Sequence, residues 1–226
     1  MATFRDNLLG GKVAFVAGGT SGINLGIAKG FAAMGAKVAV VGRDPDKAAR
    51  AAEAIGAGAI GLSADVRDYA AIRAAMEAVA GQLGPMDIVV SGAAGNFLAP
   101  ALGMSANAFR TVVDIDLNGT FNVFRGCHDL LNLPGASLIA ISAGQAVNAH
   151  VLQAHACAAK AGVNQLVRTL ALEWGPHVRV NGISPGPIAG TEGMARLAPG
   201  AEGRQSHFDR IAMKRWGEVE EIADAA

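Results

Sequence analysis

Short runs of β-branched residues alternate with alanine-rich stretches along the chain, and this alternation restricts the fold more than any other feature. The runs are KVAFVAG (12–18), KVAVVG (37–42), AIGLSADV (59–66), MDIVVSGAAG (86–95), SLIAISA (137–143) and VRVNGIS (178–184). Helices are predicted between them over about 22–34, 45–55, 68–82, 105–132 and 151–174. Strands that are apolar on both faces and separated by helices are typical of a parallel sheet covered on both sides. The sequence therefore predicts an α/β fold with a doubly wound parallel β-sheet.

Length and charge restrict the domain count and the kinds of partner. A chain of 226 residues is long enough for one large domain and short for two, so we expect one domain over 1–226. The 19 lysines and arginines balance the 19 aspartates and glutamates, so no net field draws nucleic acid or an anionic membrane. The chain has only two cysteines and no apolar segment long enough for a signal peptide, so we expect a cytoplasmic protein. We expect no metal site, because its histidines have no metal-ligand spacing.

A glycine-rich turn follows the first predicted strand and opens the first helix. In GGTSGINLG, the glycines at 18, 22 and 26 would let the backbone approach a pyrophosphate at the positive end of the helix. Such turns also occur for packing reasons. Arg43 ends the second strand where NAD-specific Rossmann-type folds usually place an acid, which favours the 2′-phosphate of NADP(H). Asp65 and Val66 end the third strand, where they could bracket an adenine ring, although Asp65 could instead begin the next helix.

The segment after Ser184 lacks sustained periodicity and is rich in glycine and proline. We expect residues 184–216 to form a loop that covers a ligand, as long loops in compact domains commonly do. The basic residues there either are ordinary solvated charges or grip an anionic ligand; these are Arg196, Arg204, Arg210, Lys214 and Arg215. The closing GEVEEIADAA predicts a helix that has begun by Ala226.

Lys160 lies on the apolar stripe of the helix predicted over 151–174. A charge on that face needs a partner or a ligand. One turn earlier stands Ala156, which carries no proton, and the chain's single tyrosine is Tyr69.

These motifs, in this order, resemble the short-chain dehydrogenase/reductase family over essentially the whole chain. The matching segments are GGTSGI (18–23), Asp65-Val66, SGAAG (91–95), Lys160 and PGPI (185–188). The resemblance implies NADP(H) contacts from the turn, the strand ends and the loop, namely Gly18, Thr20, Ser21, Gly22, Ile23, Arg43, Asp65, Val66, Ala93, Ala94, Ile141, Lys160, Pro185, Gly186 and Ile188. It also implies a homo-oligomer, usually a tetramer. Asn24 replaces the usual third glycine, and the family's seventh strand has no counterpart before Ala226.

The family's catalytic positions carry unusual residues in this chain. By resemblance the lysine falls on Lys160, but the tyrosine and serine fall on Ala156 and Ala143 and the asparagine on Asp116. Ordinary carbonyl reduction needs a positioned acid for a strongly basic alkoxide, and such an acid contributes about 10²–10⁴ in rate. The usual ketone chemistry is therefore disfavoured.

A narrower resemblance accounts for these substitutions. Residues 93–123, 152–163 and 185–193 resemble peroxisomal-type 2,4-dienoyl-CoA reductases, which share the two alanines and the aspartate. Their implied reaction passes through a dienolate, which is far less basic than an alkoxide, so held water can supply the proton. Lys160 would bind the nicotinamide ribose, and Asp116 would orient Lys160 through water or, if protonated, donate a hydrogen bond.

The same resemblance implies an acyl-CoA thioester substrate. Candidate contacts with it are Asn96, Phe97, Gln145, Gln153, His155 and Thr191. Phe97 and His155 could equally be structural, and Asp116 could be a helix residue with ordinary partners. The alternatives to a dienoyl-CoA reductase are a reductase of another activated alkene or acyl thioester, and a catalytically silent NADP(H)-binding protein.

Overall fold

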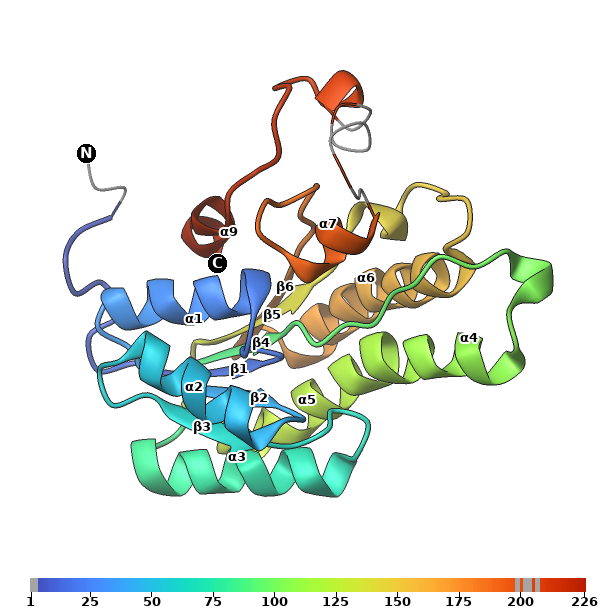
Figure 1. Cartoon of the computed structure of the whole chain (residues 1–226). Helices are drawn as coiled ribbons and strands as arrows, with labels where there is room; N and C mark the ends of the chain where they lie inside the picture. Colours follow the sequence, from blue (N-terminus) through green and yellow to red (C-terminus); the bar gives the residue numbers. More distant parts are fainter. Residues whose placement is uncertain (1–3, 198–199, 201–204, 206–207) are drawn as a thin grey trace.

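Six parallel strands form one sheet in the computed structural model, which describes residues 4–197, 200, 205 and 208–226. The strand order is β3-β2-β1-β4-β5-β6. The strands are β1 Val13–Ala17, β2 Lys37–Gly42, β3 Ile60–Ser63, β4 Ile88–Ser91, β5 Ala136–Ile141 and β6 Val178–Ile183. This order reverses direction between β1 and β4, so it confirms the predicted doubly wound parallel sheet (Figure 1).

Helices cover both faces of the sheet because alternate residues of each strand point to opposite sides. The helices that follow the strands are α1 Gly22–Ala33, α2 Pro45–Ile55, α3 Tyr69–Leu83, α4 Ala106–Val113, α5 Gly119–Cys127 and α6 Ala154–Trp174. In β1, Phe15 packs into the core shared with α3, α5 and α6, whereas Val16 packs into the core shared with α1. Both side chains are fully buried. The two cores hold the carboxyl ends of the strands at one edge of the sheet.

The helical stretch expected over 105–132 is divided into several elements. Between α4 and α5 lies one π-helical turn, Asp114–Asn118, and a short 3-10 turn, His128–Leu130, follows α5. A π-helical turn inside an α-helix is rare and is frequently found at functional sites. Here it carries Asp116, whose side chain is buried.

The segment expected to be a loop contains a short helix, α7 Glu192–Leu197. Beyond it, α9 Val219–Ala225 begins at a capping box in which Glu218 and Glu221 satisfy each other's backbone amides. The predicted final helix is therefore confirmed. It packs against α1, and a Cβ on Gly26 would collide with Val219. Gly26 thus serves helix packing, which is the alternative left open for the glycines of this segment, rather than the approach of a phosphate.

Candidate active site

The turn between β1 and α1 has the backbone of a dinucleotide-binding loop. Gly18 has φ 77° and Gly22 has φ 55°, conformations that side chains with a Cβ rarely adopt. A Cβ on Gly18 would stand 2.6 Å from the amide nitrogen of Ala93. The turn is therefore pressed against the end of β4. The amides of Gly18 and Gly19 donate to the carbonyls of Val41 and Val16, so the amides from Thr20 onward, at the amino end of α1, are the ones placed to meet an anion. These residues fit the pyrophosphate of a dinucleotide.

Asn24, which replaces the usual third glycine, ties this turn to β4. Its Nδ2 donates to the carbonyl of Gly92 at 2.7 Å and lies 3.4 Å from the carbonyl of Gly18. A Cβ on Gly92 would collide with the Asn24 side chain. The asparagine lies within α1 in helical backbone, as the sequence requires of a non-glycine residue there. Where a glycine would allow close packing of the helix against the strand, Asn24 instead links the two by a hydrogen bond.

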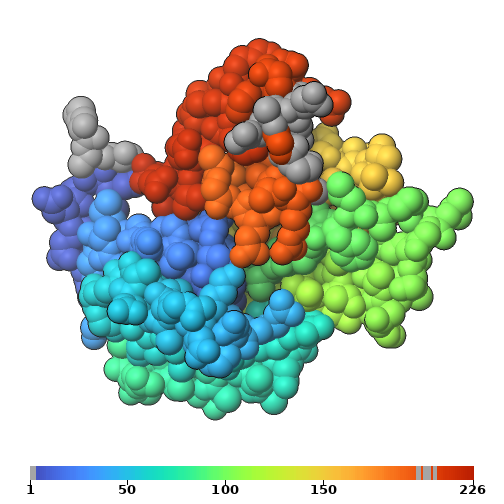
Figure 2. Space-filling model, in the orientation of Figure 1, coloured from blue at the N-terminus to red at the C-terminus, as the bar shows by residue number. Residues whose placement is uncertain are grey.

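A cleft of about 650 Å³ runs along the carboxyl ends of the strands. A second hollow of about 420 Å³ adjoins it and shares Ile23, Gln145 and Thr191 with it. The predicted residues that line the first are Gly18, Thr20, Ser21, Gly22, Ile23, Arg43, Ala93, Ala94, Asn96, Phe97, Asp116, Ile141, Gln145, Lys160 and Thr191. Those that line the second include Gln153, Pro185, Gly186 and Ile188. Figure 2 shows the orange segment that carries α7 lying over the region between the blue and green segments.

Lys160 and Asp116 meet directly at the floor of the cleft. Lys160 Nζ lies 3.2 Å from Asp116 Oδ2 and donates to the carbonyl of Ile141 at 2.9 Å. Asp116 Oδ1 accepts a hydrogen bond of 2.7 Å from the amide of Gly95. The lysine side chain is 10% exposed and the aspartate 1%. The aspartate is thus an ion-pair partner of Lys160 with no intervening water, and the reading of it as a surface helix residue is wrong.

Burial is the largest influence on the Asp116 carboxyl and raises its pKa. The charge of Lys160 and the hydrogen bond from Gly95 act in the opposite direction without reversing the shift. The carboxylate is therefore held at the site at an energetic cost, which is typical of functional positions.

The family's two hydroxyl groups are missing from the cleft. Ala143 and Ala156 line it at the positions of the serine and the tyrosine. The neighbouring Ser142 hydroxyl is engaged with Asn164 Oδ1 at 2.6 Å. No tyrosine in the described part of the chain can substitute, because Tyr69 lines a separate surface hollow.

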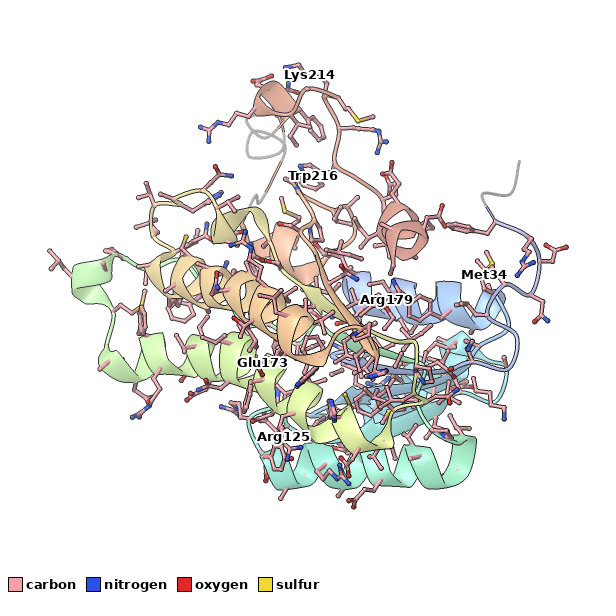
Figure 3. All side chains as sticks on the ribbon, turned by 180° about the vertical axis from the view of Figure 1, so that it is seen from behind. Met34, Arg125, Glu173, Arg179, Lys214 and Trp216 are labelled. Carbon is pink, nitrogen blue, oxygen red and sulfur yellow. The ribbon has the colours of Figure 1, made fainter. Side chains whose placement is uncertain are left out.

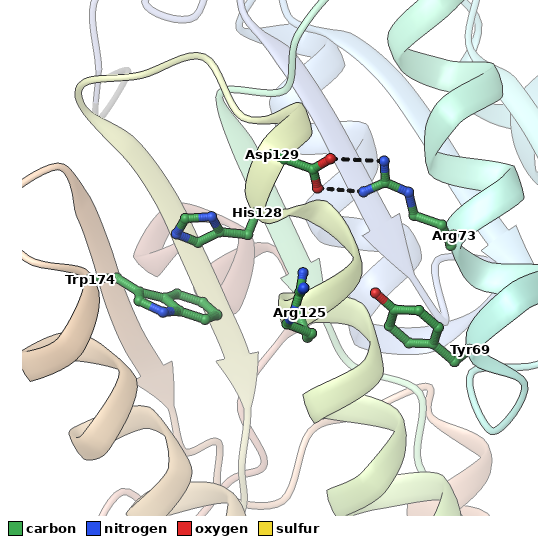
Figure 4. Close-up of a pocket in the computed structure, with 6 residues that line it drawn as sticks. All are labelled: Tyr69, Arg73, Arg125, His128, Asp129 and Trp174. Atoms are coloured by element: carbon green, nitrogen blue, oxygen red, sulfur yellow. Dashed lines mark hydrogen bonds and ion pairs between the residues drawn. The ribbon is translucent and has the colours of Figure 1, made fainter.

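That separate hollow lies between α3, α5 and the end of α6 (Figure 4). Arg73 is paired there with Asp129, and the rings of His128 and Trp174 stand edge to face with centroids 4.8 Å apart. None of the predicted site residues lines it.

Three amide side chains converge where the two clefts join. Gln153 Oε1 accepts from Asn96 Nδ2 at 2.7 Å and from Gln145 Nε2 at 3.1 Å. Asn96 Oδ1 is buried and has no hydrogen-bond partner among the described residues. This cluster offers amide groups to a polar part of a ligand.

His155 lies behind the cleft rather than in its wall. Its side chain is fully buried, and its ring stands edge to face with Phe97, with centroids 4.3 Å apart. Neither ring nitrogen has a hydrogen-bond partner among the described residues. Phe97 lines the larger cleft and His155 lines neither hollow, so the geometry gives His155 no direct contact with a ligand there.

At the adenosine end, Arg43 faces the cleft and the two residues predicted beside it do not. Asp65 is paired with Arg67, whose hydrogen bond is the main reason that the pKa of Asp65 is lowered. Val66 packs into the core. The first residue of the next helix follows Asp68, which accepts a hydrogen bond from Ala71, so Asp65 does not begin that helix.

The basic residues of the segment 184–216, here called the lid segment, lie in different environments. Arg196 lines the larger cleft and Arg210 the smaller one. Lys214 donates to the carbonyl of Asp209, and Arg215 pairs with Glu221. Figure 3 shows Lys214 at the outer end of this segment, away from the sheet. Arg204 lies outside the described residues.

Sequence reasoning missed three contributors to the site. Gly95 holds Asp116 through a backbone amide, which no side-chain pattern reveals. Lys47 and Glu192 line opposite walls of the larger cleft and form an ion pair. The position of Lys47, four residues after Arg43, was the one available signal.

Fold and site together define a dinucleotide-binding α/β protein with a buried lysine–aspartate pair at the strand ends. A family model described as enoyl-(acyl carrier protein) reductase matches residues 17–226. The chain belongs to the short-chain dehydrogenase/reductase family and is an oxidoreductase.

Several curated relatives are peroxisomal 2,4-dienoyl-CoA reductases. The protein of Arabidopsis thaliana is 42% identical over 99% of this chain and 79% of its own length. That of Rattus norvegicus is 42% identical over 97% of this chain and 77% of its own length. A short-chain dehydrogenase from Bacillus anthracis superposes with a TM-score of 0.84 at 33% identity, covering 95% of this chain and 87% of its own. A gluconate 5-dehydrogenase from Burkholderia cenocepacia, in complex with NADP and tartrate, has a TM-score of 0.88 at 27% identity, covering 97% and 88%.

Two further properties follow from the described residues. None of their helices has the length and apolarity to cross a lipid bilayer. They also contain no cluster of three or more histidine, cysteine, aspartate or glutamate side chains arranged to hold a metal ion.

Proposed function

We propose that the protein is an NADPH-dependent reductase of 2,4-dienoyl-CoA thioesters that forms a 3-enoyl-CoA product in fatty-acid β-oxidation. The observation that carries the proposal is the buried pair of Lys160 and Asp116 beside Ala143 and Ala156. A site with a lysine but no hydroxyl acid suits a reaction whose anion is only weakly basic. The names of the relatives from plants and mammals support the same substrate class.

Most of the residues predicted to hold NADP(H) line the larger cleft. The backbone amides of residues 20–23 would hold the pyrophosphate, and Arg43 would meet the 2′-phosphate. Lys160 Nζ, which has one carbonyl and one carboxylate partner, retains a third proton for the nicotinamide ribose. When bound, the cofactor supplies a hydride to the δ carbon of the conjugated thioester.

Lys160 has a second task near the thioester. Its positive charge stabilises the negative charge that spreads to the thioester oxygen. Asp116 fixes the ammonium group in place through their 3.2 Å contact. The α carbon then takes a proton from held water, because no serine or tyrosine hydroxyl stands at the family's two positions.

The second hollow would take the acyl thioester. Asn96, Gln145 and Gln153 stand at its junction with the larger cleft, where an amide N–H of Gln145 would donate to the thioester oxygen. Phe97, on the adjoining wall of the larger cleft, would pack against the acyl chain, and Arg210, which lines the second hollow, would meet the phosphates of coenzyme A. A homo-oligomeric state and a cytoplasmic location stay predictions.

The test mixes purified protein, NADPH and 2,4-hexadienoyl-CoA and follows the loss of NADPH absorbance. Turnover that requires all three components supports the proposal. Turnover of a different enone or acyl thioester, with none of the dienoyl-CoA, would favour the alternative reductase.

The two alanines also fit a protein that binds NADP(H) without catalysis. The variant Lys160→Ala distinguishes such a silent protein from the proposed reductase. In a silent protein it changes only the affinity for the cofactor, whereas in the reductase it also removes turnover at saturating NADPH.

A further inference from the structure

An ion pair bridges the two walls of the larger cleft near its adenosine end. Lys47 lies in the first turn of α2, and its Nζ stands 3.2 Å from Oε1 of Glu192, the first residue of α7. The two residues are 145 positions apart in the sequence. Both line the cleft, Lys47 on the wall that also carries Arg43 and Glu192 on the wall formed by α7. α2 packs into the same core as α1, and Figure 1 shows α2 below α1 and the orange helix α7 above it in this view.

The wall that carries Lys47 offers two cations to one place. Lys47 follows Arg43 by four residues, and both line the cleft. Of the two carboxylates between them, Asp44 is engaged as the N-cap of α2, where it accepts the amide of Lys47 at 3.0 Å. That hydrogen bond is the main reason that the pKa of Asp44 is lowered. The acid whose ion pair with Lys47 is present in the structure is Glu192.

We propose that Lys47 exchanges Glu192 for the 2′-phosphate of NADPH, so that the ion pair is a latch opened by the phosphorylated cofactor and not by NADH. The inference rests on the proposed use of NADPH. The pair is weak because both side chains are substantially exposed, 38% for Lys47 and 64% for Glu192. A phosphate dianion with three acceptor oxygens binds a lysine more strongly than an exposed carboxylate does.

The exchange leaves no charge without a partner. Glu192 Oε2 already stands 3.4 Å from Arg196, one turn along α7. When Lys47 turns to the phosphate, Arg196 remains to neutralise Glu192. The release also frees α7 from α2, and the α7 segment carries Thr191 and Met194, which line the smaller cleft. Recognition of the 2′-phosphate is thereby linked to the wall of the substrate site.

The experiment measures the dissociation constants of NADPH and NADH by fluorescence titration, without substrate. The variants are Lys47→Met and Glu192→Gln. Lys37→Met is the matched control because Lys37 is an exposed lysine at the opposite end of β2. Circular dichroism checks that each variant is folded, which we expect since Lys37 and Glu192 are exposed and Lys47 is partly exposed.

The latch predicts opposite effects from its two halves. Lys47→Met weakens NADPH binding about 10-fold, the loss of one charge-assisted contact, and leaves NADH within twofold. Glu192→Gln tightens NADPH binding about two- to fivefold, because the competing carboxylate is gone, and leaves NADH unchanged. Lys37→Met changes neither affinity.

Glu192→Gln with unchanged or weaker NADPH binding would overturn the latch, as would a Lys47→Met effect of equal size on both cofactors. Failure of the proposed reaction looks different. A wild-type protein that shows the two opposite shifts but does not reduce 2,4-dienoyl-CoA contradicts the reaction and supports the latch.

Discussion

Replacing Asp116 by asparagine tests whether the buried carboxylate serves function rather than stability. Asparagine preserves the volume and can still accept the 2.7 Å hydrogen bond from Gly95, but it removes the charge that faces Lys160 at 3.2 Å. Loss of one partner of a buried ion pair usually destabilises a fold by about 3–5 kcal/mol. Here burial raises the pKa of the carboxyl despite Lys160. The free-energy cost of burying the charged carboxylate is therefore larger than the stabilisation that it gains from its ion pair with Lys160. We therefore expect Asp116→Asn to remain within about 1 kcal/mol of the parent at pH 7, or about 4 °C in Tm.

The pH dependence has a defined sign. A carboxyl whose folded pKa is raised contributes stability that is full below its unfolded value of about 3.9 and is lost as the pH rises through the folded pKa. The stability of the parent relative to Asp116→Asn therefore declines from pH 4 toward neutrality. Urea unfolding of both proteins across this range gives the difference directly. Turnover should meanwhile fall by about 10²-fold, because Lys160 loses the group that orients it.

Two results would refute this reasoning about Asp116. One is a loss of 3 kcal/mol or more at pH 7, which would make the carboxylate a net stabilising partner of Lys160. The other is a free energy of unfolding of the parent that increases, relative to that of the variant, as the pH rises. Double substitution with Lys160→Met, measured against both single variants, gives the coupling energy between the two side chains.

Three smaller predictions concern other buried or bridging groups. His155→Phe should stabilise the fold by about 1 kcal/mol or more in thermal unfolding, because it removes two unpaired ring nitrogens, and a loss of 2 kcal/mol would indicate an unrecognised partner. Burial alone would raise the pKa of Asp87, but its hydrogen bonds, including one of 2.9 Å from Lys12, lower it, so its contribution to stability is lost as the pH falls through the folded pKa. Asp87→Asn should flatten that acid-side decline in urea unfolding, and an unchanged profile would assign the decline to other groups. Gln145→Leu should lower turnover modestly while the NADPH affinity stays constant, and unchanged kinetics would exclude Gln145 from the substrate site.

The sheet could be predicted from the sequence because its strands are apolar on both faces, and only a doubly covered parallel sheet buries both. Lys160 could be predicted as a functional residue because a charge on an apolar helical stripe requires a partner. Its position opposite Asp116 followed from the family resemblance, but their direct contact did not. The π-helical turn at Asp114–Asn118 places that carboxylate, and a local change of hydrogen-bond register leaves no periodic signal in the sequence.

Features that depend on distant segments could not be predicted from local patterns. Gly26 fits both a phosphate turn and a packing contact, and only the position of Val219 decides between them. The ion pair between Lys47 and Glu192 likewise needs the lid segment folded over the cleft. The burial of His155 behind Phe97 has no signature beyond the helical stripe.

The site of hydride addition tests the central claim most directly. Protein, 2,4-hexadienoyl-CoA and NADPH deuterated at the transferred position are combined, and the product is analysed by NMR. A dienolate formed beside Lys160, with protonation of the α carbon by water, predicts a 3-enoyl-CoA with deuterium at the δ carbon and a solvent-derived proton at the α carbon. Deuterium at the β carbon, or no product while NADPH binds normally, would contradict it.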